Sequence, residues 1–261
     1  MSGLALDSRR VSAGTLFFAL PGEKEDGGDF IAEAMARGAA CAVCEQPPEG
    51  ERPYILVPDA HKALALCAAV WYGTPAGKMT LVGVTGTNGK TTTTYLIKQI
   101  LERTRSARVG LIGTNQNLIG DKVVPTERTT PDALTVQRLL AQMADAGCAY
   151  AVMEVSSHAL MQSRVAGIHF RVGVFTNLTQ DHLDYHGTME AYCDAKARLF
   201  DQCGIACVNG DDPWTRRLLA RFAGERVTFG QGMTNDLVGW RARYENDCVR
   251  FTACTDLDHE E

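Results

Sequence analysis

The chain has 261 residues, of which 45% are hydrophobic and 22% charged, a composition that excludes an intrinsically disordered protein. Its net charge of -5, from 26 Lys and Arg against 31 Asp and Glu, excludes a general nucleic-acid-binding surface. No apolar run approaches the ~20 residues of a membrane-spanning helix, and charged residues interrupt residues 1–10, where a signal peptide would be apolar. We therefore expect a cytoplasmic protein without nucleic-acid or membrane partners.

A small α/β unit comes first and ends in a Pro- and Gly-rich segment at 73–77. Short apolar runs predict strands at 15–20, 39–45 and 54–57, and helical spacing of apolar residues predicts helices at 30–37 and 61–72. The first domain would span residues 1–76 and the second residues 77–261.

The second region alternates strands and helices more clearly. We expect strands at 80–85, 149–155, 172–176 and 205–208, and helices at 90–103, 130–147, 188–200 and 213–222. The helix at 130–147 would begin with Thr130 as its cap and Pro131 in its first turn. Beyond residue 236, alternating apolar and polar residues predict an antiparallel hairpin with its turn at 245–247. The whole pattern predicts an α/β fold in which helices cover both faces of a mostly parallel sheet.

The nine cysteines lie mostly in apolar stretches, and their odd number predicts reduced, buried thiols. Cys41 and Cys44 form a close pair, but no second pair follows at the spacing of a zinc site. Because residues three apart on a strand face opposite sides of the sheet, we expect neither a metal nor a redox role for this pair.

A phosphate-binding loop is the most specific motif. It lies between the predicted strand at 80–85 and helix at 90–103, and it comprises Gly86, Thr87, Asn88, Gly89, Lys90, Thr91 and Thr92. In this position backbone N–H groups and a helix N-terminus can bind phosphate, Lys90 can neutralise the β- and γ-phosphates, and the Thr91 hydroxyl can bind Mg²⁺. A glycine-rich turn without a ligand is the alternative. No guanine-reading Asn-Lys-x-Asp follows, which favours ATP over GTP.

Acidic and histidine side chains follow two of the other predicted strands. Glu154 lies at the end of the strand at 149–155, and His182 follows the strand at 172–176. Ligands of an open parallel sheet bind beyond the carboxyl ends of its strands, so both residues could approach the phosphates, and one carboxylate suffices for Mg²⁺ beside ATP. Taken singly, Glu154 could equally form an ion pair, and His158, His182 and His186 could make ordinary hydrogen bonds.

These motifs resemble those of the Mur ligases of peptidoglycan synthesis. The resemblance rests on Thr-Gly-Thr-Asn-Gly-Lys-Thr-Thr at 85–92, Met-Glu-Val-Ser-Ser-His at 153–158 and Thr-Asn-Leu-Thr-Gln-Asp-His-Leu-Asp-Tyr-His-Gly at 176–187. Leu-Asp-Ser-Arg at 6–9, with the segments 127–130 and 191–200, narrows it to the MurE type. It implies a small N-terminal α/β domain that binds UDP, followed by a central, mostly parallel-sheet domain that binds ATP.

The resemblance also implies roles for individual residues. ATP would be bound by 86–92, the catalytic residues would be Lys90, Glu154, His182 and Lys196, and Mg²⁺ would lie among Thr91, Glu154, His182 and Lys196. The UDP-muramoyl-dipeptide would contact Leu6, Ser8, Glu23, Lys24, Glu25, Arg128, Thr129, Thr130, Ser156, Gln162 and Arg164. Lys196 matches the lysine that this family carbamylates with CO₂ to N6-carboxylysine. From spacing alone, Lys196 and Arg198 could instead form the exposed face of a helix.

The implied reaction has two steps. ATP phosphorylates the γ-carboxylate of UDP-N-acetylmuramoyl-L-alanyl-D-glutamate, and a diamino acid, meso-diaminopimelate or L-lysine, then attacks the acyl phosphate to give an amide, ADP and phosphate. The carboxylate and the triphosphate are both anionic, so Lys90, Arg164 and Mg²⁺ would offset their repulsion.

Mur ligases also have a C-terminal domain, which in the MurE type carries an Asp-Asn-Pro-Arg motif that this sequence lacks. We therefore expect a fragment, without the C-terminal ligase domain and the end of the central one, that binds its ligands without turnover. A catalytically inactive nucleotide- or UDP-sugar-binding remnant and a folylpolyglutamate synthetase-like ligase are the alternatives. A complete protein would be monomeric, whereas an incomplete central sheet predicts exposed apolar surface and self-association.

Overall fold

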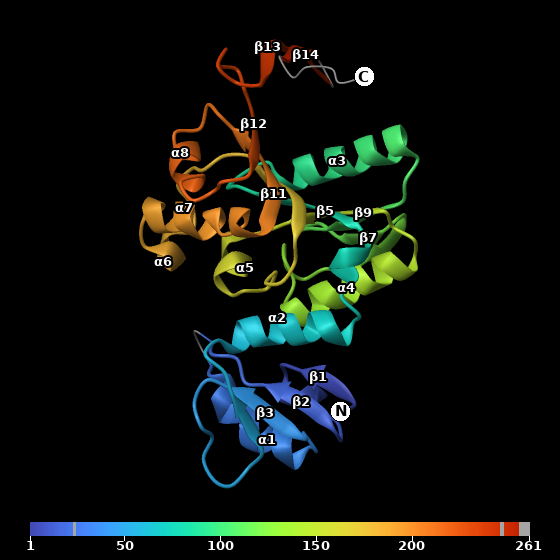
Figure 1. Ribbon diagram of the computed structural model, residues 1–261, viewed down its shortest axis with the longest axis vertical. Helices are drawn as coiled ribbons and strands as arrows, with labels where there is room; N and C mark the ends of the chain where they lie inside the picture. Colours follow the sequence, from blue (N-terminus) through green and yellow to red (C-terminus); the bar gives the residue numbers. More distant parts are fainter. Residues whose placement is uncertain (23–24, 246–247, 256–261) are drawn as a thin grey trace.

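The computed structural model describes residues 1–22, 25–245 and 248–255, which are arranged around two β-sheets (Figure 1). The smaller sheet belongs to the N-terminal part and has the strand order β1-β2-β3-β4, with every pairing parallel. Its strands are β1 (Gly3–Ala5), β2 (Thr15–Phe18), β3 (Cys41–Cys44) and β4 (Tyr54–Leu56). The helical elements beside it are α1 (Ile31–Ala36) and the 3₁₀ turns η1 (Ser8–Arg10) and η2 (Gly27–Phe30).

The larger sheet has the strand order β14-β13-β12-β11-β10-β5-β9-β6-β7-β8 among the described residues. All pairings from β13 to β6 are parallel, and antiparallel strands close both ends. The strands are β5 (Thr80–Thr85), β6 (Val109–Ile112), β7 (Asn117–Ile119), β8 (Lys122–Val124), β9 (Tyr150–Glu154), β10 (Phe170–Phe175), β11 (Cys203–Asn209), β12 (Glu225–Gly230), β13 (Leu237–Glu245) and β14 (Cys248–Thr255).

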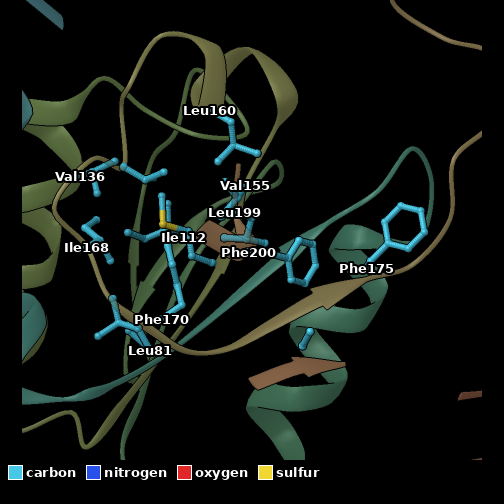
Figure 2. Close-up of a cluster of buried hydrophobic side chains, with 14 of the residues drawn as sticks. Leu81, Ile112, Val136, Val155, Leu160, Ile168, Phe170, Phe175, Leu199 and Phe200 are labelled. Atoms are coloured by element: carbon cyan, nitrogen blue, oxygen red, sulfur yellow. The ribbon is translucent and has the colours of Figure 1, made fainter. Parts of the chain in front are cut away.

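Helices cover both faces of the larger sheet, as the sequence predicts. They are α3 (Lys90–Arg105), α4 (Ala133–Asp145), α5 (Ser157–Met161), α6 (Leu183–His186), α7 (Met189–Ala197) and α8 (Thr215–Leu218), with the 3₁₀ turns η3 (Pro75–Lys78) and η4 (Phe200–Gln202). Side chains alternate across β5: Val82 and Val84 pack with apolar residues of α3. Leu81 packs on the opposite face in the main core, which Figure 2 shows together with Val136 of α4 and Leu160 of α5. Buried strands with such faces on both sides account for the predicted fold class.

Helix α2 (Ala60–Trp71) connects the two sheets and lies between the small sheet and α4 (Figure 1). Its Leu64 packs in one cluster with Phe18 of β2 and Ala133 of α4. The Asp59 carboxylate caps α2 by accepting the backbone N–H of Lys62 at 2.7 Å, and it also accepts a hydrogen bond from the Ser163 hydroxyl at 3.4 Å. The N-terminal part is therefore attached to the loop after α5 by a polar contact as well as by apolar packing.

Two predicted helices, at 130–147 and 213–222, differ most from the observed ones. The helix expected at Thr130 begins at Ala133, because Asp132 is its cap and accepts the backbone N–H of Thr135. The Thr130 hydroxyl instead donates to the Glu154 carbonyl and accepts the Ser156 N–H. The helix expected at 213–222 is the single turn α8. The strands β1, β6, β7, β8 and β12 and the short helices α5 and α6 were not predicted. The hairpin lies where we expect it, but residues 246–247 of its turn are outside the described residues.

The expected burial of the cysteines is wrong at three positions. Cys67 on α2 and Cys248 and Cys254 on β14 are exposed. The hairpin also exposes large apolar side chains, including Tyr244 at 88% and Phe251 at 61%. Among the described residues, no helix combines the length and the apolarity needed to cross a membrane.

Candidate nucleotide and acceptor site

The loop at 86–89 connects the end of β5 directly to the start of α3, as predicted. Gly86 (φ 141°) and Gly89 (φ 82°) have positive φ, which a side chain disfavours. A Cβ on Gly86 would also overlap the Thr176 hydroxyl. Gly89 is the cap residue of α3 and offers no side chain to its first N–H groups, so they are free to bind an anion.

The segment after β10 holds this loop in place. The Thr87 N–H donates to the Asn177 carbonyl at 2.8 Å, and the Asn88 N–H donates to Asn177 Oδ1 at 3.0 Å. The Thr87 hydroxyl lies 3.2 Å from the carbonyl oxygen of Thr179. The loop therefore has its phosphate-binding shape without depending on a ligand, which reduces the ordering that binding requires.

Two lysines converge on one backbone oxygen. Lys90 Nζ donates to the carbonyl oxygens of Gly86 and Thr87 at 2.9 and 2.8 Å, and Lys196 Nζ donates to the same Gly86 oxygen at 2.9 Å. Lys196 comes from α7, is 1% exposed, and lies 4.3 Å from the centre of the Tyr192 ring. Burial and then the positive charge of Lys90 lower the pKa of Lys196 to about 7, and burial also lowers the pKa of Lys90. An exposed-face role for Lys196 is excluded.

Glu154 ends β9 and is completely buried. Its Oε2 accepts a hydrogen bond from the Thr91 hydroxyl at 3.0 Å, and its Oε1 accepts the backbone N–H of Thr114 at 2.9 Å. A Cβ on Gly113 would overlap Oε1, so the carboxylate fits against a backbone that has no side chain at this point. A hydroxyl and a carboxylate that face each other supply the hard oxygen ligands that Mg²⁺ prefers, so this pair fits that ion.

His182 belongs to a cluster of aromatic and histidine rings that includes Tyr192. It begins α6 with a left-handed backbone (φ 52°), and its ring is 5.1 Å from His158 and 6.2 Å from Tyr192. The rings of His186 and Tyr192 stack with their centres 4.9 Å apart. The pKa of His186 is lowered to about 4, mainly because the ring is partly buried and secondly because His158 repels its positive charge. Tyr192 thus lies between the histidines and Lys196.

A cavity of about 560 Å³ separates the start of the chain from the segment before α4. Leu6 and Arg128, both predicted to contact substrate, line it, together with charged residues such as Arg9 and Arg138. Next to this segment, Arg164 donates to the Thr130 carbonyl at 2.7 Å and to Gln162 Oε1 at 3.0 Å. Burial and then the charge of Arg128 lower the pKa of Arg164.

Hydrogen bonds position five of the predicted substrate-binding residues. The Thr130 hydroxyl contacts both the Ser156 N–H and the Glu154 carbonyl, and Thr129 lies beside Thr114. These contacts bring Thr129, Thr130, Ser156, Gln162 and Arg164 to the carboxyl edge of the sheet next to Glu154.

Two of the predicted contacts, Ser8 and Glu25, belong neither to this group nor to the lining of the cavity. Ser8 is only 5% exposed, and its hydroxyl donates to Glu33 at 2.9 Å, inside the N-terminal part. Glu25 is exposed. Glu23 and Lys24 lie outside the described residues.

The structure adds residues to the site that we did not single out from the sequence. They are Gly113 and Thr114 after β6, Asn177 and Thr179 after β10, and Tyr192 on α7. The rule that places ligands beyond the carboxyl ends of parallel strands would have found those after β10, whose strand was predicted. It missed Thr114 because β6 was not recognised.

The fold and the loop together define a nucleotide-binding α/β protein of the phosphate-loop class. Residues 84–260 match the Mur ligase middle domain, and residues 1–72 match the domain described as Mur ligase family, catalytic domain. The chain belongs to the Mur ligase family.

Relatives and solved structures agree with this assignment. The chain is 47% identical over 261 residues to the UDP-N-acetylmuramoyl-L-alanyl-D-glutamate–2,6-diaminopimelate ligase of Geobacillus kaustophilus, covering 97% of this chain and 53% of the relative. A solved structure of a ligase with the same name superposes with a TM-score of 0.84 at 30% identity, covering 97% of this chain and 53% of that one. Folylpolyglutamate synthase of Mycobacterium tuberculosis, complexed with ADP and AMPPCP, shares the fold at a TM-score of 0.60 and 16% identity, over 74% of this chain and 51% of that one. The chain spans about half the length of these relatives.

Proposed function

We propose that this chain provides the ATP site and the UDP-substrate site of an ATP-dependent amide ligase in peptidoglycan synthesis. The ligase would join meso-diaminopimelate or L-lysine to UDP-N-acetylmuramoyl-L-alanyl-D-glutamate in the cytoplasm. The observation that carries the proposal is the convergence of Lys90 and Lys196 on the Gly86 carbonyl, at a loop whose following residue Thr91 faces Glu154. A cavity lies between the N-terminal part and the segment before α4. The names of the 47% and 30% identical relatives support this choice of substrate.

The nucleotide side of the reaction depends on charge neutralisation. The open N-terminus of α3 and the loop N–H groups bind phosphate oxygens, and Lys90 is near enough to turn from the loop carbonyls towards them. Thr91 and Glu154 would hold Mg²⁺, and the ion would withdraw charge from the phosphate under attack. Lys90 stabilises the same charge, so the γ-phosphoryl group can approach an anionic carboxylate.

The environment of Lys196 suits carbamylation. A lysine amine reacts with CO₂ only when it is neutral, and a pKa of about 7 leaves a large neutral fraction at neutral pH. The carbamate is an anion, so it would replace the repulsion between Lys196 and Lys90 by attraction and would add an oxygen ligand for Mg²⁺.

The acceptor side is positioned by the segment from Thr129 to Asp132 and by Arg164. Arg164 offers a half-buried positive charge that is already fixed by Thr130 and Gln162, an arrangement suited to a carboxylate of the dipeptide. Leu6, Arg9 and Arg10 line the cavity on the N-terminal side, where two cationic side chains would attract the diphosphate. With the carboxylate and the γ-phosphate held at one edge, catalysis would be mostly positioning.

Calorimetric titration of the 261-residue chain tests this proposal. One titrant is an unreactive Mg²⁺-bound ATP analogue, and the other is UDP-N-acetylmuramoyl-L-alanyl-D-glutamate. We expect Lys90→Ala to weaken nucleotide binding by at least about tenfold with little effect on the acceptor, and Arg164→Ala to do the reverse. Lys78→Ala, a change of an exposed lysine on η3, is the control and should leave both affinities unchanged. Failure of the unaltered chain to bind the nucleotide would contradict the proposal.

A further inference from the structure

Thr114 lies between the two halves of the proposed site. It follows β6 and Gly113, and it contacts Glu154 twice: its N–H donates to Oε1 at 2.9 Å, and its hydroxyl oxygen lies 3.0 Å from Oε2. The same hydroxyl oxygen is 3.1 Å from Thr129 Oγ1, on the acceptor side. Glu154 Oε2 in turn accepts from Thr91, on the nucleotide side.

The direction of these hydrogen bonds follows from the number of protons. The Thr114 hydroxyl has one proton, and the buried Glu154 carboxylate is a stronger acceptor than a neutral hydroxyl. Thr114 therefore donates to Glu154, and the Thr129 hydroxyl oxygen, 3.1 Å away, is a second acceptor within reach of the same proton. The result is a continuous chain of side chains from Thr129 through Thr114 and Glu154 to Thr91, formed by contacts of 3.1, 3.0 and 3.0 Å.

We propose that Thr114 is a positioning residue that couples acceptor binding to nucleotide binding through Glu154. The proposal rests on the function proposed above for the two sides. An acceptor that fixes Thr129 also fixes the orientation of Thr114, and through it the carboxylate that faces Thr91. The acceptor thereby sets the position of the carboxylate that meets the nucleotide, and the nucleotide does the same in the reverse direction, so each ligand strengthens the binding of the other.

The backbone around Thr114 leaves the carboxylate little freedom. Gly113 packs so closely against Oε1 that no side chain fits there, and the Thr114 N–H holds the same oxygen. Glu154 therefore cannot reorient independently of the segment after β6. A shift of Thr114 consequently displaces the Glu154 carboxylate as well.

The experiment measures nucleotide affinity with and without saturating acceptor, by calorimetry of the full 261-residue chain with the same two ligands. We expect the acceptor to raise nucleotide affinity at least about fivefold, and nucleotide to raise acceptor affinity by the same factor. Thr114→Val keeps the shape and the N–H contact but removes the hydroxyl, and it should reduce the coupling below about twofold. Thr114→Ser keeps the hydroxyl and should retain the coupling.

Two further variants separate coupling from general damage. Thr129→Val removes the other end of the chain of contacts and should lose the coupling too, which keeps the test available if Thr114→Val fails to fold. Thr104→Val is the matched control: it makes the same change on α3, where the Thr104 hydroxyl donates to the Ile100 carbonyl. It should leave the coupling between the two ligands unchanged. The coupling proposal would be overturned if the coupling survived in both Thr114→Val and Thr129→Val. It would also be overturned if the unaltered chain bound the two ligands independently, although the proposed function would then remain intact. Absence of nucleotide binding would overturn both.

Discussion

Replacing Lys196 by Met tests how strongly the site disfavours a buried charge. Lowering the pKa from 10.5 to about 7 corresponds to about 5 kcal/mol of unfavourable free energy for the charged form in the folded chain. Met has a similar length and carries no charge, but it loses the hydrogen bond to the Gly86 carbonyl and the contact with the Tyr192 ring, together about 2 kcal/mol. The variant should therefore be more stable than the unaltered chain by about 3 kcal/mol at low pH.

The free energy of unfolding should depend on pH in the unaltered chain, and the direction of this dependence follows from the lowered pKa of Lys196. Between pH 7 and 10.5 the unfolded chain binds a proton at Lys196 that the folded chain does not, so the free energy of unfolding of the unaltered chain falls as the pH is lowered across this range and then stays constant. The Met variant lacks this dependence. The difference in the free energy of unfolding between the Met variant and the unaltered chain should reach its full value below pH 7 and should fall to about zero near pH 9.5.

Urea denaturation at pH 6.5 and 9.5, in buffers free of CO₂ so that no carbamate forms, measures the difference directly. Lys78→Met, a change of an exposed lysine, is the matched control and should show no such difference between the two pH values. A stability difference between Lys196→Met and the unaltered chain that does not change with pH, or a variant that is less stable at pH 6.5, would refute the argument that Lys196 is an uncompensated buried cation.

Three further predictions concern other parts of the molecule. Gly86→Ala should lower the free energy of unfolding by about 3 kcal/mol in urea denaturation, because the added methyl group combines an unfavourable φ with a steric overlap; a loss below about 1 kcal/mol would contradict the loop geometry. Gly113→Ala should weaken binding of the Mg²⁺-bound ATP analogue at least about tenfold by displacing the Glu154 carboxylate, and unchanged affinity in calorimetry would show that this contact is unimportant. The unaltered chain should self-associate through its hairpin in sedimentation velocity, and Val249→Lys combined with Phe251→Lys should make it monomeric; a monomeric unaltered chain would exclude this.

Long, regular elements of the second region could be predicted from the sequence, and short ones could not. The strand at 80–85 was found with its observed bounds because five of its six residues are β-branched or apolar and a glycine-rich loop follows. β6 has only four residues, Gly110 among them, because the side chain of Met143 occupies the space where a Cβ would lie. Tertiary packing explains that glycine, and the local sequence does not.

The candidate site also has features that could be predicted from the sequence and features that could not. The loop at 86–89 and the strand-end position of Glu154 follow from order along the chain, so they could be predicted. The start of α4 could not, because Thr130 has two uses in principle, as a cap or as a tether to β9, and only the folded sheet brings the Glu154 carbonyl within reach. The burial of Lys196 likewise depends on α7 packing against the loop, which no local pattern records.

The carboxylate of Asp59 has a consequence for how the sequence can vary. One oxygen begins α2 in the N-terminal part and the other holds Ser163, between Gln162 and Arg164. A substitute must therefore satisfy two segments that are 104 positions apart in the chain. Asn keeps the cap through its one oxygen and presents an N–H donor to the Ser163 hydroxyl, whereas Ser keeps only the cap, because its side chain is shorter and has a single oxygen. We expect natural variation here to be narrow, and any exchange at Asp59 to be accompanied by a change at Ser163, so that the two parts vary together.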